Sequence, residues 1–250
     1  MKELIDKGNL PKHIAVVMDG NGRWAQNQGA ARIFGHRNAI KAVREVTEGC
    51  AELGISYLTL YAFSTENWAR PEFEVRALME LLVQSIRNEL PTMLKNNVKL
   101  DTIGDIESLP VSCQRQLAEA SEATKDNTGL NLVLALGYSG KWDITQAVKK
   151  IALDVQNGAL KADDITENVL SSQLATNPRP DVDLMLRTGG DHRISNFLLW
   201  QLAYAELYFY EDLYWPDFRK ENLYQAILSY QGTERRFGKT GEQIKANSAK

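Results

Sequence analysis

One segment near the start of the chain places a carboxylate beside two glycines and an arginine. The segment reads Asp19-Gly20-Asn21-Gly22-Arg23-Trp24. Glycines allow a tight turn that brings backbone N–H groups close to a ligand, and a guanidinium matches the oxygens of a phosphate. A carboxylate belongs in such a cradle when a divalent cation lies between the two, because Mg²⁺ is commonly held by one or two carboxylates plus phosphate oxygens. The pattern predicts a phosphate site with Mg²⁺, and its alternative is a tight turn with solvated side chains.

Two later segments combine arginines with small polar residues. The first reads Ser64-Thr65-Glu66-Asn67-Trp68-Ala69-Arg70. The second reads Arg187-Thr188-Gly189-Gly190-Asp191-His192-Arg193-Ile194-Ser195-Asn196. A capped helix start explains Thr65 or Asn67, but it does not explain a Trp and an Arg in the same loop. Paired arginines with glycines suit a diphosphate, and a mixed-charge surface loop is the alternative for the second segment.

Three more charged or titratable residues are candidates for the same chemistry. Arg32 and His36 stand four residues apart, so they would face one ligand together if the segment is helical. Glu206 lies inside a long apolar run. A buried Glu is rare unless it is paired or bound to a metal. Glu206 is therefore a candidate metal ligand, with a structural ion pair as the alternative.

Two patterns point to other enzyme classes but fit them poorly. Residues 20–25 match the dinucleotide fingerprint GxGxxA, yet residues 29–35 separate it from the clear helical pattern, and no acid ends the second apolar run to bind a ribose. Asp163 and Asp164 resemble one copy of the acidic motif of trans-prenyl synthases, which carry two. A helix N-cap with acids in its first turn explains this pair better. A nicotinamide-dependent oxidoreductase remains an alternative that a cofactor titration would test.

The elements that must position these residues alternate between apolar strands and helices. The expected strands are His13–Asp19, Tyr57–Phe63, Val98–Ile103, Leu130–Leu136, Asp183–Arg187 and Glu206–Tyr210. The expected helices are Asn38–Leu53, Pro71–Leu90, Ser108–Thr124, Trp142–Gln156 and Arg219–Tyr230. This alternation predicts an α/β fold with a mostly parallel central sheet of about six strands flanked by helices. Ligands of such sheets lie beyond the carboxyl ends of the strands, which is where the three segments follow.

The composition is that of an ordinary globular protein, with 44% hydrophobic and 24% charged residues among 250. We expect one domain over residues 1–250, with loose ends at about 1–10 and 240–250. The net charge of −3 argues against a nucleic-acid partner. No apolar run reaches the roughly 18 residues of a membrane span, and two cysteines in expected helices indicate reduced thiols in a cytoplasmic protein. The helix at Pro71–Leu90 is apolar beyond one stripe, so it is either buried on two sides or lines an apolar cavity.

Four segments together resemble one known family. They read HIAVVMDGNGRWA, RIFGH, YAFSTENWARP and RTGGDHRISNFLLWQLAYAELYF, in this order, between about His13 and Arg236. In sequence and order they resemble the undecaprenyl diphosphate synthases, the bacterial cis-prenyltransferases. The resemblance implies a Mg²⁺-dependent enzyme that condenses isopentenyl diphosphate repeatedly onto farnesyl diphosphate to give undecaprenyl diphosphate, the lipid carrier precursor for cell-wall polysaccharides. It also implies a homodimer, an apolar substrate tunnel, and transient contact with the inner face of the membrane for product release.

The same resemblance implies roles for individual residues. Asp19 is expected to hold Mg²⁺ and to be essential, Asn67 matches the proton-acceptor position, and Glu206 matches a second metal ligand near the dimer interface. The allylic diphosphate is expected against Gly20, Asn21, Gly22, Arg23, Trp24, Arg32 and His36. The substrate loop is expected to comprise Ser64, Thr65, Glu66, Trp68 and Arg70. Isopentenyl diphosphate is expected at Arg187, Arg193, Ile194 and Ser195.

The chain departs from the family pattern in one place, and three alternatives stay open. Gly189 stands where Ser is usual and Asp191 where Glu is usual, which leaves the role of those two side chains undecided. The alternatives are a shorter-chain cis-prenyl synthase, a non-catalytic partner subunit, and the oxidoreductase above. Product length is not fixed by the sequence, although Ala62 and Leu130 lie where the resemblance would set the depth of a tunnel.

Overall fold

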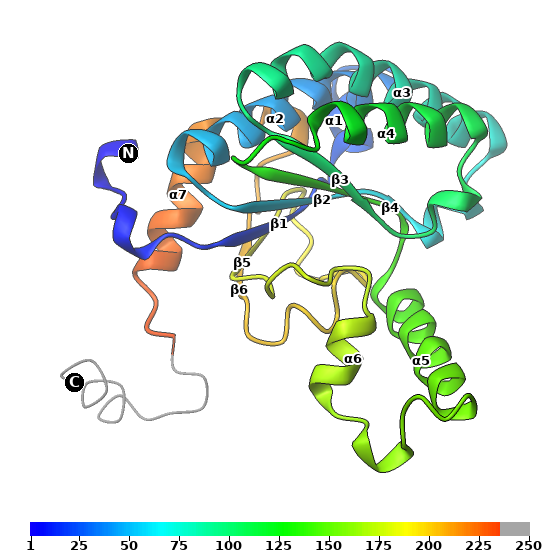
Figure 1. Ribbon diagram of the computed structural model, residues 1–250. Coiled ribbons are helices and arrows are strands. Elements are labelled where there is room, and N and C mark those ends of the chain that lie inside the picture. Colours follow the sequence, from blue (N-terminus) through cyan, green and yellow to red (C-terminus); the bar gives the residue numbers. More distant parts are fainter. Residues whose placement is uncertain (236–250) are drawn as a thin grey trace.

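The computed structural model describes residues 1–235, which form one six-stranded sheet with helices around it (Figure 1). The strands are β1 His13–Val17, β2 Tyr57–Ser64, β3 Lys99–Ile103, β4 Asn131–Tyr138, β5 Leu184–Arg187 and β6 Glu206–Phe209. Their order is β3-β4-β2-β1-β5-β6, and every neighbouring pair is parallel. The predicted α/β fold with about six parallel strands is confirmed. All the carboxyl ends therefore point to one edge of the sheet, where the three candidate segments follow.

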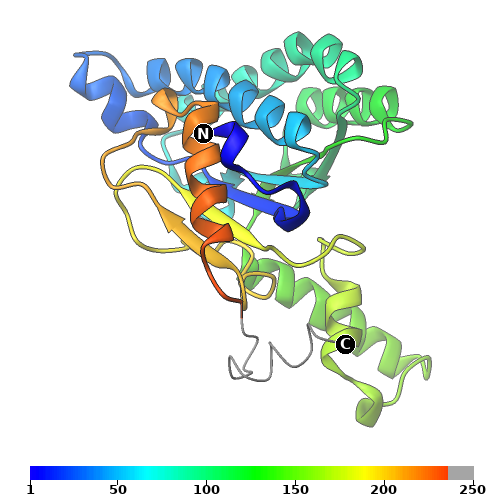
Figure 2. The ribbon, with the colours of Figure 1, turned by 90° about the vertical axis from the view of Figure 1, so that its left-hand side faces the viewer.

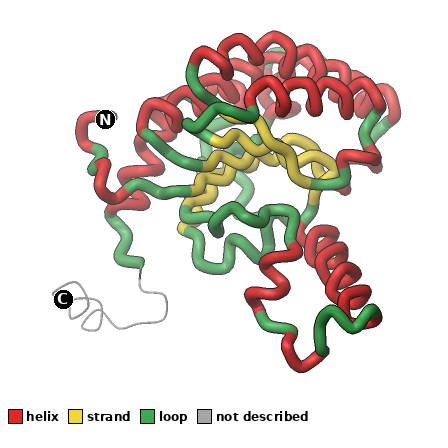
Figure 3. Tube along the Cα trace, viewed as in Figure 1, coloured by secondary structure: helices red, strands yellow, loops and turns green. Residues whose placement is uncertain are grey.

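The two faces of the sheet are covered in different ways (Figure 1, Figure 2). The helices are α1 Asn21–Asn27, α2 Arg32–Leu53, α3 Glu72–Lys95, α4 Val111–Thr124, α5 Gly140–Gln156, α6 Glu167–Gln173 and α7 Lys220–Gln231. Helices α2, α3 and α4 cover one face, whereas α5 and α6 project away from the body below the other. Figure 3 shows that loops make up most of the layer directly under the sheet. None of the helices in residues 1–235 is long and apolar enough to cross a membrane.

The strands are continuously apolar because both faces of the sheet are buried. Side chains alternate between faces along a strand. Ile14 and Val16 of β1 pack into the core under the helical layer, and Ala15 and Val17 pack into a second core against the loops. Phe197 belongs to this second core and stacks on a tyrosine of β2 at a ring distance of 4.3 Å. A loop layer thus replaces a full helical layer on this face.

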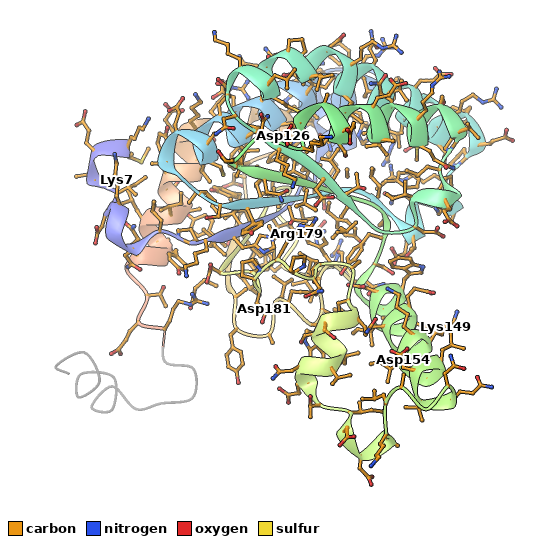
Figure 4. The ribbon with its side chains drawn as sticks, viewed as in Figure 1. Lys7, Asp126, Lys149, Asp154, Arg179 and Asp181 are labelled. Carbon is orange, nitrogen blue, oxygen red and sulfur yellow. The ribbon has the colours of Figure 1, made fainter. Side chains whose placement is uncertain are left out.

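Buried polar bonds hold the loop layer in place. Asp143 near the start of α5 accepts hydrogen bonds from the Tyr138 hydroxyl at 2.9 Å and from the Ala175 backbone N–H at 2.8 Å. Arg179 forms an ion pair with Asp101 of β3, and it is labelled in Figure 4. The part of α5 that carries Lys149 and Asp154 lies away from these contacts (Figure 4). The first turn of α5 is therefore tied to β4 and to the loop layer.

Two local expectations differ from the structure: the turn at the glycine-rich segment is a helix, and the helix expected from Asn38 begins at Arg32 as α2. The glycine-rich segment was expected to be a turn, but Gly20 with φ of +96° is the N-cap of α1. Helix α2 crosses α1 so closely that a Cβ at Gly35 would lie 1.9 Å from the Asn21 carbonyl oxygen. Asp163 and Asp164 lie in the first turn of a 3₁₀ helix, Ala162–Asp164, and Thr166 is the N-cap of α6, with its side chain accepting from Val169 N–H. The missing apolar stripe in α1 explains why the pattern did not reveal it.

The ends of the chain were expected to be loose. Residues 1–10 instead form two short 3₁₀ helices, Lys2–Leu4 and Lys7–Asn9, with Ile5 buried between them. Lys2 forms an ion pair with Glu52 at 2.6 Å, which ties this segment to α2. The tail expected at 240–250 lies outside the described residues.

Candidate active site

The carboxylate of Asp19 lies just beyond the end of β1, between arginines from two other parts of the chain. Its Oδ1 accepts the Gly20 backbone N–H at 2.6 Å and lies 3.3 Å from Nη2 of Arg23. Its Oδ2 accepts Nη2 of Arg187 at 2.8 Å. Burial alone would raise the pKa of Asp19, but hydrogen bonds from Arg187 and Gly20 and the charge of Arg23 hold it below its usual value. Asp19 is therefore a carboxylate anion at neutral pH.

A second carboxylate, Asp191, completes a cluster of alternating charges. Its Oδ2 lies 2.9 Å from Arg193, 3.3 Å from Arg23 and 3.5 Å from Arg187. We call Asp19, Arg23, Arg187, Asp191 and Arg193 the charged cluster. Three guanidinium groups share two carboxylates, so the cluster keeps one positive charge for an anionic ligand. Asp191 stands where the family usually has Glu, and the structure gives it a place in the arginine network.

Arg187 is the most buried member of the charged cluster, with a side chain only 3% exposed. Its Nη1 donates to the Ser195 hydroxyl at 2.7 Å and also to the Arg193 carbonyl oxygen. Its buried Nε has no hydrogen-bond partner within residues 1–235. A buried donor without a partner is costly. Arg187 thus fixes Ser195 and keeps one buried N–H unsatisfied.

Asn67 lies in a 3₁₀ turn, Thr65–Ala69, directly after β2, and its amide is oriented by the backbone. Its Oδ1 accepts the Ser64 backbone N–H at 3.1 Å. Because a backbone N–H can only donate, the amide oxygen must face it, and the Nδ2 donors of Asn67 point the other way. Glu66 in the same turn accepts Nδ2 of Asn196 at 2.8 Å. Asn67 therefore offers a donor to a ligand, and Asn196 ties this turn to the loop after β5.

Two pockets meet at this edge of the sheet. The apolar pocket, about 260 Å³, runs between the sheet, α2 and α3, and its floor includes Leu132, Leu134 and Leu136. The polar pocket is lined by residues from all three candidate segments, among them Arg187 and Ser195. Both pockets are lined by Met18, Asp19, Tyr61, Asn67 and Arg70. One carboxylate and one amide thus face both an apolar cavity and an arginine-lined cavity.

Comparisons with known proteins show the family of this chain. Residues 17–238 match the family described as "Putative undecaprenyl diphosphate synthase". The chain belongs to the undecaprenyl diphosphate synthase family. It is 51% identical over 244 residues to the Aliivibrio fischeri protein named ditrans,polycis-undecaprenyl-diphosphate synthase ((2E,6E)-farnesyl-diphosphate specific), covering 98% of this chain and 95% of that one. The family predicted from the four segments is confirmed.

Two solved structures of related proteins share the fold. Lavandulyl diphosphate synthase from Lavandula x intermedia, solved in complex with dimethylallyl diphosphate, has a TM-score of 0.90 and 34% identity, with 92% of this chain and 99% of that chain covered. The Campylobacter jejuni protein described as "a probable undecaprenyl diphosphate synthase" has a TM-score of 0.77 and 37% identity, with 92% and 100% covered. The fold of this synthase family therefore extends over nearly the whole described chain.

The structure brings many of the family-matched residues to the two pockets. Those lining the apolar pocket are Asp19, Asn21, Gly22, Arg32, His36, Asn67 and Arg70. Those lining the polar pocket also include Ser64, Glu66, Arg187 and Ser195. The pKa of His36 falls to about 4, first because of burial and then because of the nearby Arg70 charge. His36 is therefore neutral at pH 7.

Other family-matched residues lie around the pockets rather than on their walls. A Cβ at Gly20 would lie 2.5 Å from the Tyr214 ring, so this glycine permits a close contact behind the phosphate segment. Trp24 stacks on Phe34 at 5.8 Å and donates its indole N–H to Asp217 at 2.8 Å. The remaining residues that line neither pocket are Arg23, Thr65, Trp68, Arg193 and Ile194. Arg23 and Arg193 are connected to the site through their contacts with Asp19 and Asp191 in the charged cluster.

Glu206 is not brought to this site within one chain. It begins β6 and pairs in register with Leu184 at the amino end of β5, whereas Asp19 lies beyond the carboxyl end of β1. No group of three His, Cys, Asp or Glu residues that could hold a metal ion is present in residues 1–235.

Sequence reasoning missed a segment that supports the phosphate site from behind. This segment, Tyr214–Asp217, follows β6, and its Trp215 backbone N–H donates to the Asp19 carbonyl oxygen at 3.0 Å. The Arg23 guanidinium lies 5.7 Å from the centre of the Tyr214 ring. The rule that ligand sites follow the strand ends would have pointed to this segment, because it too begins soon after a strand.

Proposed function

We propose that this chain is a Mg²⁺-dependent cis-prenyltransferase that condenses isopentenyl diphosphate repeatedly onto farnesyl diphosphate to give undecaprenyl diphosphate. One observation carries the proposal: Asp19 and Asn67 face both an apolar cavity and a cavity lined by Arg187 and Ser195. An allylic diphosphate with a hydrocarbon tail fits the first cavity. A short homoallylic diphosphate fits the second. The name of the 51% identical relative supports farnesyl diphosphate as the allylic substrate.

The residues of the site match the charges that this reaction develops. The carbon–oxygen bond of the allylic diphosphate breaks, a carbon–carbon bond forms to isopentenyl diphosphate, and one proton leaves the adduct. Arg23 and the α1 N-terminus would hold the leaving diphosphate, and Arg187, Arg193 and Ser195 would hold the other one. Asn67 would donate through Nδ2 to the phosphate oxygen or water that takes the proton, because its Oδ1 is already engaged by Ser64.

The donor set around Asp19 fits a magnesium ion carried by substrate. Asp19 is an ionised carboxylate at the meeting point of the two pockets, and Mg²⁺ is typically bound by one or two carboxylates together with substrate phosphates. Bound there, the ion would neutralise charge that builds on the leaving diphosphate. The proposed second ligand, Glu206, would have to act from a partner subunit, given its place at the opposite edge of the sheet.

We also propose a homodimer, formed through the β6 side of the molecule. Strand β6 is an edge strand, and an edge presents unpaired backbone groups to another chain. Exposed apolar side chains lie on β6 and α5, among them Leu207, Val148 and Leu153.

A cytoplasmic location with transient contact at the inner membrane face completes the proposal. Sedimentation should give twice the chain mass, and liposome flotation should depend on product.

The decisive experiment is turnover of radiolabelled isopentenyl diphosphate with farnesyl diphosphate, with and without Mg²⁺. A Mg²⁺-dependent product of about eleven isoprene units, lost in Asp19→Ala, is the expected result. A shorter product would favour a short-chain synthase, the second candidate, which the modest 260 Å³ cavity and the likeness to lavandulyl diphosphate synthase support. No product from folded protein would favour a non-catalytic partner subunit.

A further inference from the structure

Three aromatic side chains are exposed near the mouth of the apolar pocket. Phe73 in the first turn of α3 is 77% exposed, Phe34 in the first turn of α2 is 42% exposed, and Trp68 between β2 and α3 is 38% exposed. Trp68 packs edge-to-face with Phe63, which lines the pocket, at a ring distance of 4.9 Å. Trp68 therefore borders the opening of the pocket.

Contacts between the starts of α2 and α3 place the two phenylalanines beside the same opening. Arg32 and Arg70 line the apolar pocket, and they lie 3.9 Å and 3.1 Å from Glu74 of α3. Phe73 directly precedes Glu74, and Phe34 follows Arg32 by two residues. The first turns of α2 and α3 thus meet at the mouth of the pocket, and each carries one exposed aromatic ring.

Both phenylalanines point away from the interior of the pocket. Val43 of α2 and Leu82 of α3 line the pocket. Phe34 lies nine residues before Val43, and Phe73 lies nine residues before Leu82, which is two and a half turns at 3.6 residues per turn. The two rings are therefore on the outer faces of α2 and α3, the helices that cover one face of the sheet in Figure 1.

The outer face of α2 beside Phe34 is basic. Arg37 and Lys41 follow Phe34 by three and seven residues, so they share its side of the helix, and both are exposed. Within residues 1–235 neither of them forms an ion pair. Residues 20–44 contain no Asp or Glu, although the whole chain has a net charge of −3. This corner of the molecule therefore carries a local excess of positive charge.

The acids near this surface are already engaged by other arginines. Glu72 at the start of α3 accepts Nη2 of Arg76 at 2.8 Å. Glu74 lies near Arg70 and Arg32, as described above. The charges of Arg37 and Lys41 are therefore left for an anionic partner.

We infer that Phe34, Arg37, Lys41 and Phe73, which we call the rim surface, dock on an anionic lipid bilayer beside the mouth of the apolar pocket. The inference rests on the proposed prenyltransferase function, whose product carries a long apolar chain. Exposed aromatic side chains enter the interface of a bilayer, and basic side chains next to them attract anionic headgroups. Docking by the rim surface brings the mouth close to lipid, so the product passes into the bilayer with a short path through water.

The test is binding of the substrate-free protein to vesicles made of phosphatidylglycerol and phosphatidylcholine in equal parts, measured by flotation. Arg37→Gln combined with Lys41→Gln should weaken binding about ten- to thirtyfold, because each basic residue near an anionic surface contributes to it. Phe73→Ser should weaken binding about tenfold, because an aromatic ring no longer leaves water. Binding should also fall with added salt and on pure phosphatidylcholine vesicles, and bound product should tighten it.

Two controls remove the same kinds of side chain far from the mouth. Lys7→Gln combined with Lys95→Gln removes two exposed charges, one before β1 and one at the last residue of α3. Leu4→Ser removes an apolar side chain that is 72% exposed in the short helix before β1. Both controls should bind the anionic vesicles as wild type does. Circular dichroism checks that every variant folds.

Turnover separates failure of the rim surface from failure of the proposed function. The first condensation should stay within about twofold of wild type in all of these variants, because none of the changed residues lines either pocket. If wild type elongates but does not bind the anionic vesicles, or if both rim variants bind as tightly as wild type, the docking surface is wrong while the proposed function stands. If wild type makes no polyprenyl product, the proposed function fails and the inference falls with it.

Discussion

The Asp19 end of the apolar pocket and its leucine floor are built on opposite principles. At the Asp19 end, five charged residues share short contacts, and Asp19 alone accepts from Gly20 and Arg187 at 2.6 and 2.8 Å. Along the floor, Leu132, Leu134 and Leu136 contribute volume and no polar bond. The Asp19 end is sensitive to charge and to the placement of single atoms, and the leucine floor to space.

The largest effect should come from changing charge without changing shape. Asp19→Asn leaves Arg23 and Arg187 facing a neutral amide, and loss of such an electrostatic contact lowers turnover by about 10²–10³. Turnover of labelled isopentenyl diphosphate at saturating Mg²⁺ measures the loss. Asp126→Asn, at an exposed acid after α4 (Figure 4), is the control and should keep full activity. Less than a tenfold loss in Asp19→Asn would place the essential charge elsewhere.

The reverse change, of shape without charge, should act on stability. Leu134→Ala removes a buried side chain from the pocket floor, and such truncations cost about 2–3 kcal/mol in unfolding free energy. The rate of the first condensation should remain within a few-fold of wild type. Urea unfolding followed by circular dichroism measures the first quantity, and single-turnover kinetics the second. A Leu134→Ala variant that keeps its stability but loses turnover would contradict the division of roles between the Asp19 end and the leucine floor.

A smaller effect is expected where the substrate turn is tied to the loop after β5. Asn196→Asp keeps an acceptor for the Lys141 N–H and tolerates a φ of +60°, but it replaces the donor to Glu66 by a second carboxylate. We expect KM for isopentenyl diphosphate to rise about tenfold, or about 1.4 kcal/mol, with a smaller change in kcat. Adding Glu66→Gln supplies a donor again and should recover most of the loss. A uniform fall in kcat without recovery would indicate a purely structural role.

The smallest effect concerns His36, a titratable group that lines the apolar pocket. Its pKa is lowered to about 4 in the folded chain, chiefly by burial, against about 6.5 when unfolded. Between these values the unfolded state binds more protons, so stability falls as pH drops from 6.5 to 4. We expect His36→Gln to reduce this pH dependence, measured by urea unfolding at pH 7, 5.5 and 4.5. An identical pH dependence in the variant would show that burial of His36 does not matter.

The sequence predicted the apolar strands and helices better than the polar contacts of the site. The strand at residues 57–63 and the helix that ends at Leu53 were visible because apolar residues recur with the period of their element, although that helix begins at Arg32 and not at Asn38. The helix α1 was missed because Asn21–Asn27 has no apolar stripe, its N-cap is Gly20, and it contains Gly22. The helix α3 runs to Lys95, past Pro91, where the pattern suggested an end at Leu90.

The site was predicted as a set of loops, but the bonds inside it were not. The three strand-end segments indicated which residues would meet, because carboxyl ends of parallel strands share an edge. The contact of Asp191 with Arg23, and the tie from Asn196 to Glu66, join residues 130 or more positions apart. Their partners are set by the geometry of the loops, which has no periodic signature in the sequence. Asp217 and Tyr214 were missed for the same reason.

The close crossing of α1 and α2 sets how freely two glycines can vary. At position 35 the obstacle is space, since a single added carbon would lie 1.9 Å from the Asn21 carbonyl oxygen. At position 29 no atom lies within 4 Å of an added carbon, and the obstacle is only a φ of +67°. In a randomised library selected for activity, position 35 should return glycine alone, whereas position 29 should also return asparagine and aspartate. The residues accepted at each position would then show whether space for a side chain or backbone conformation limits substitution there.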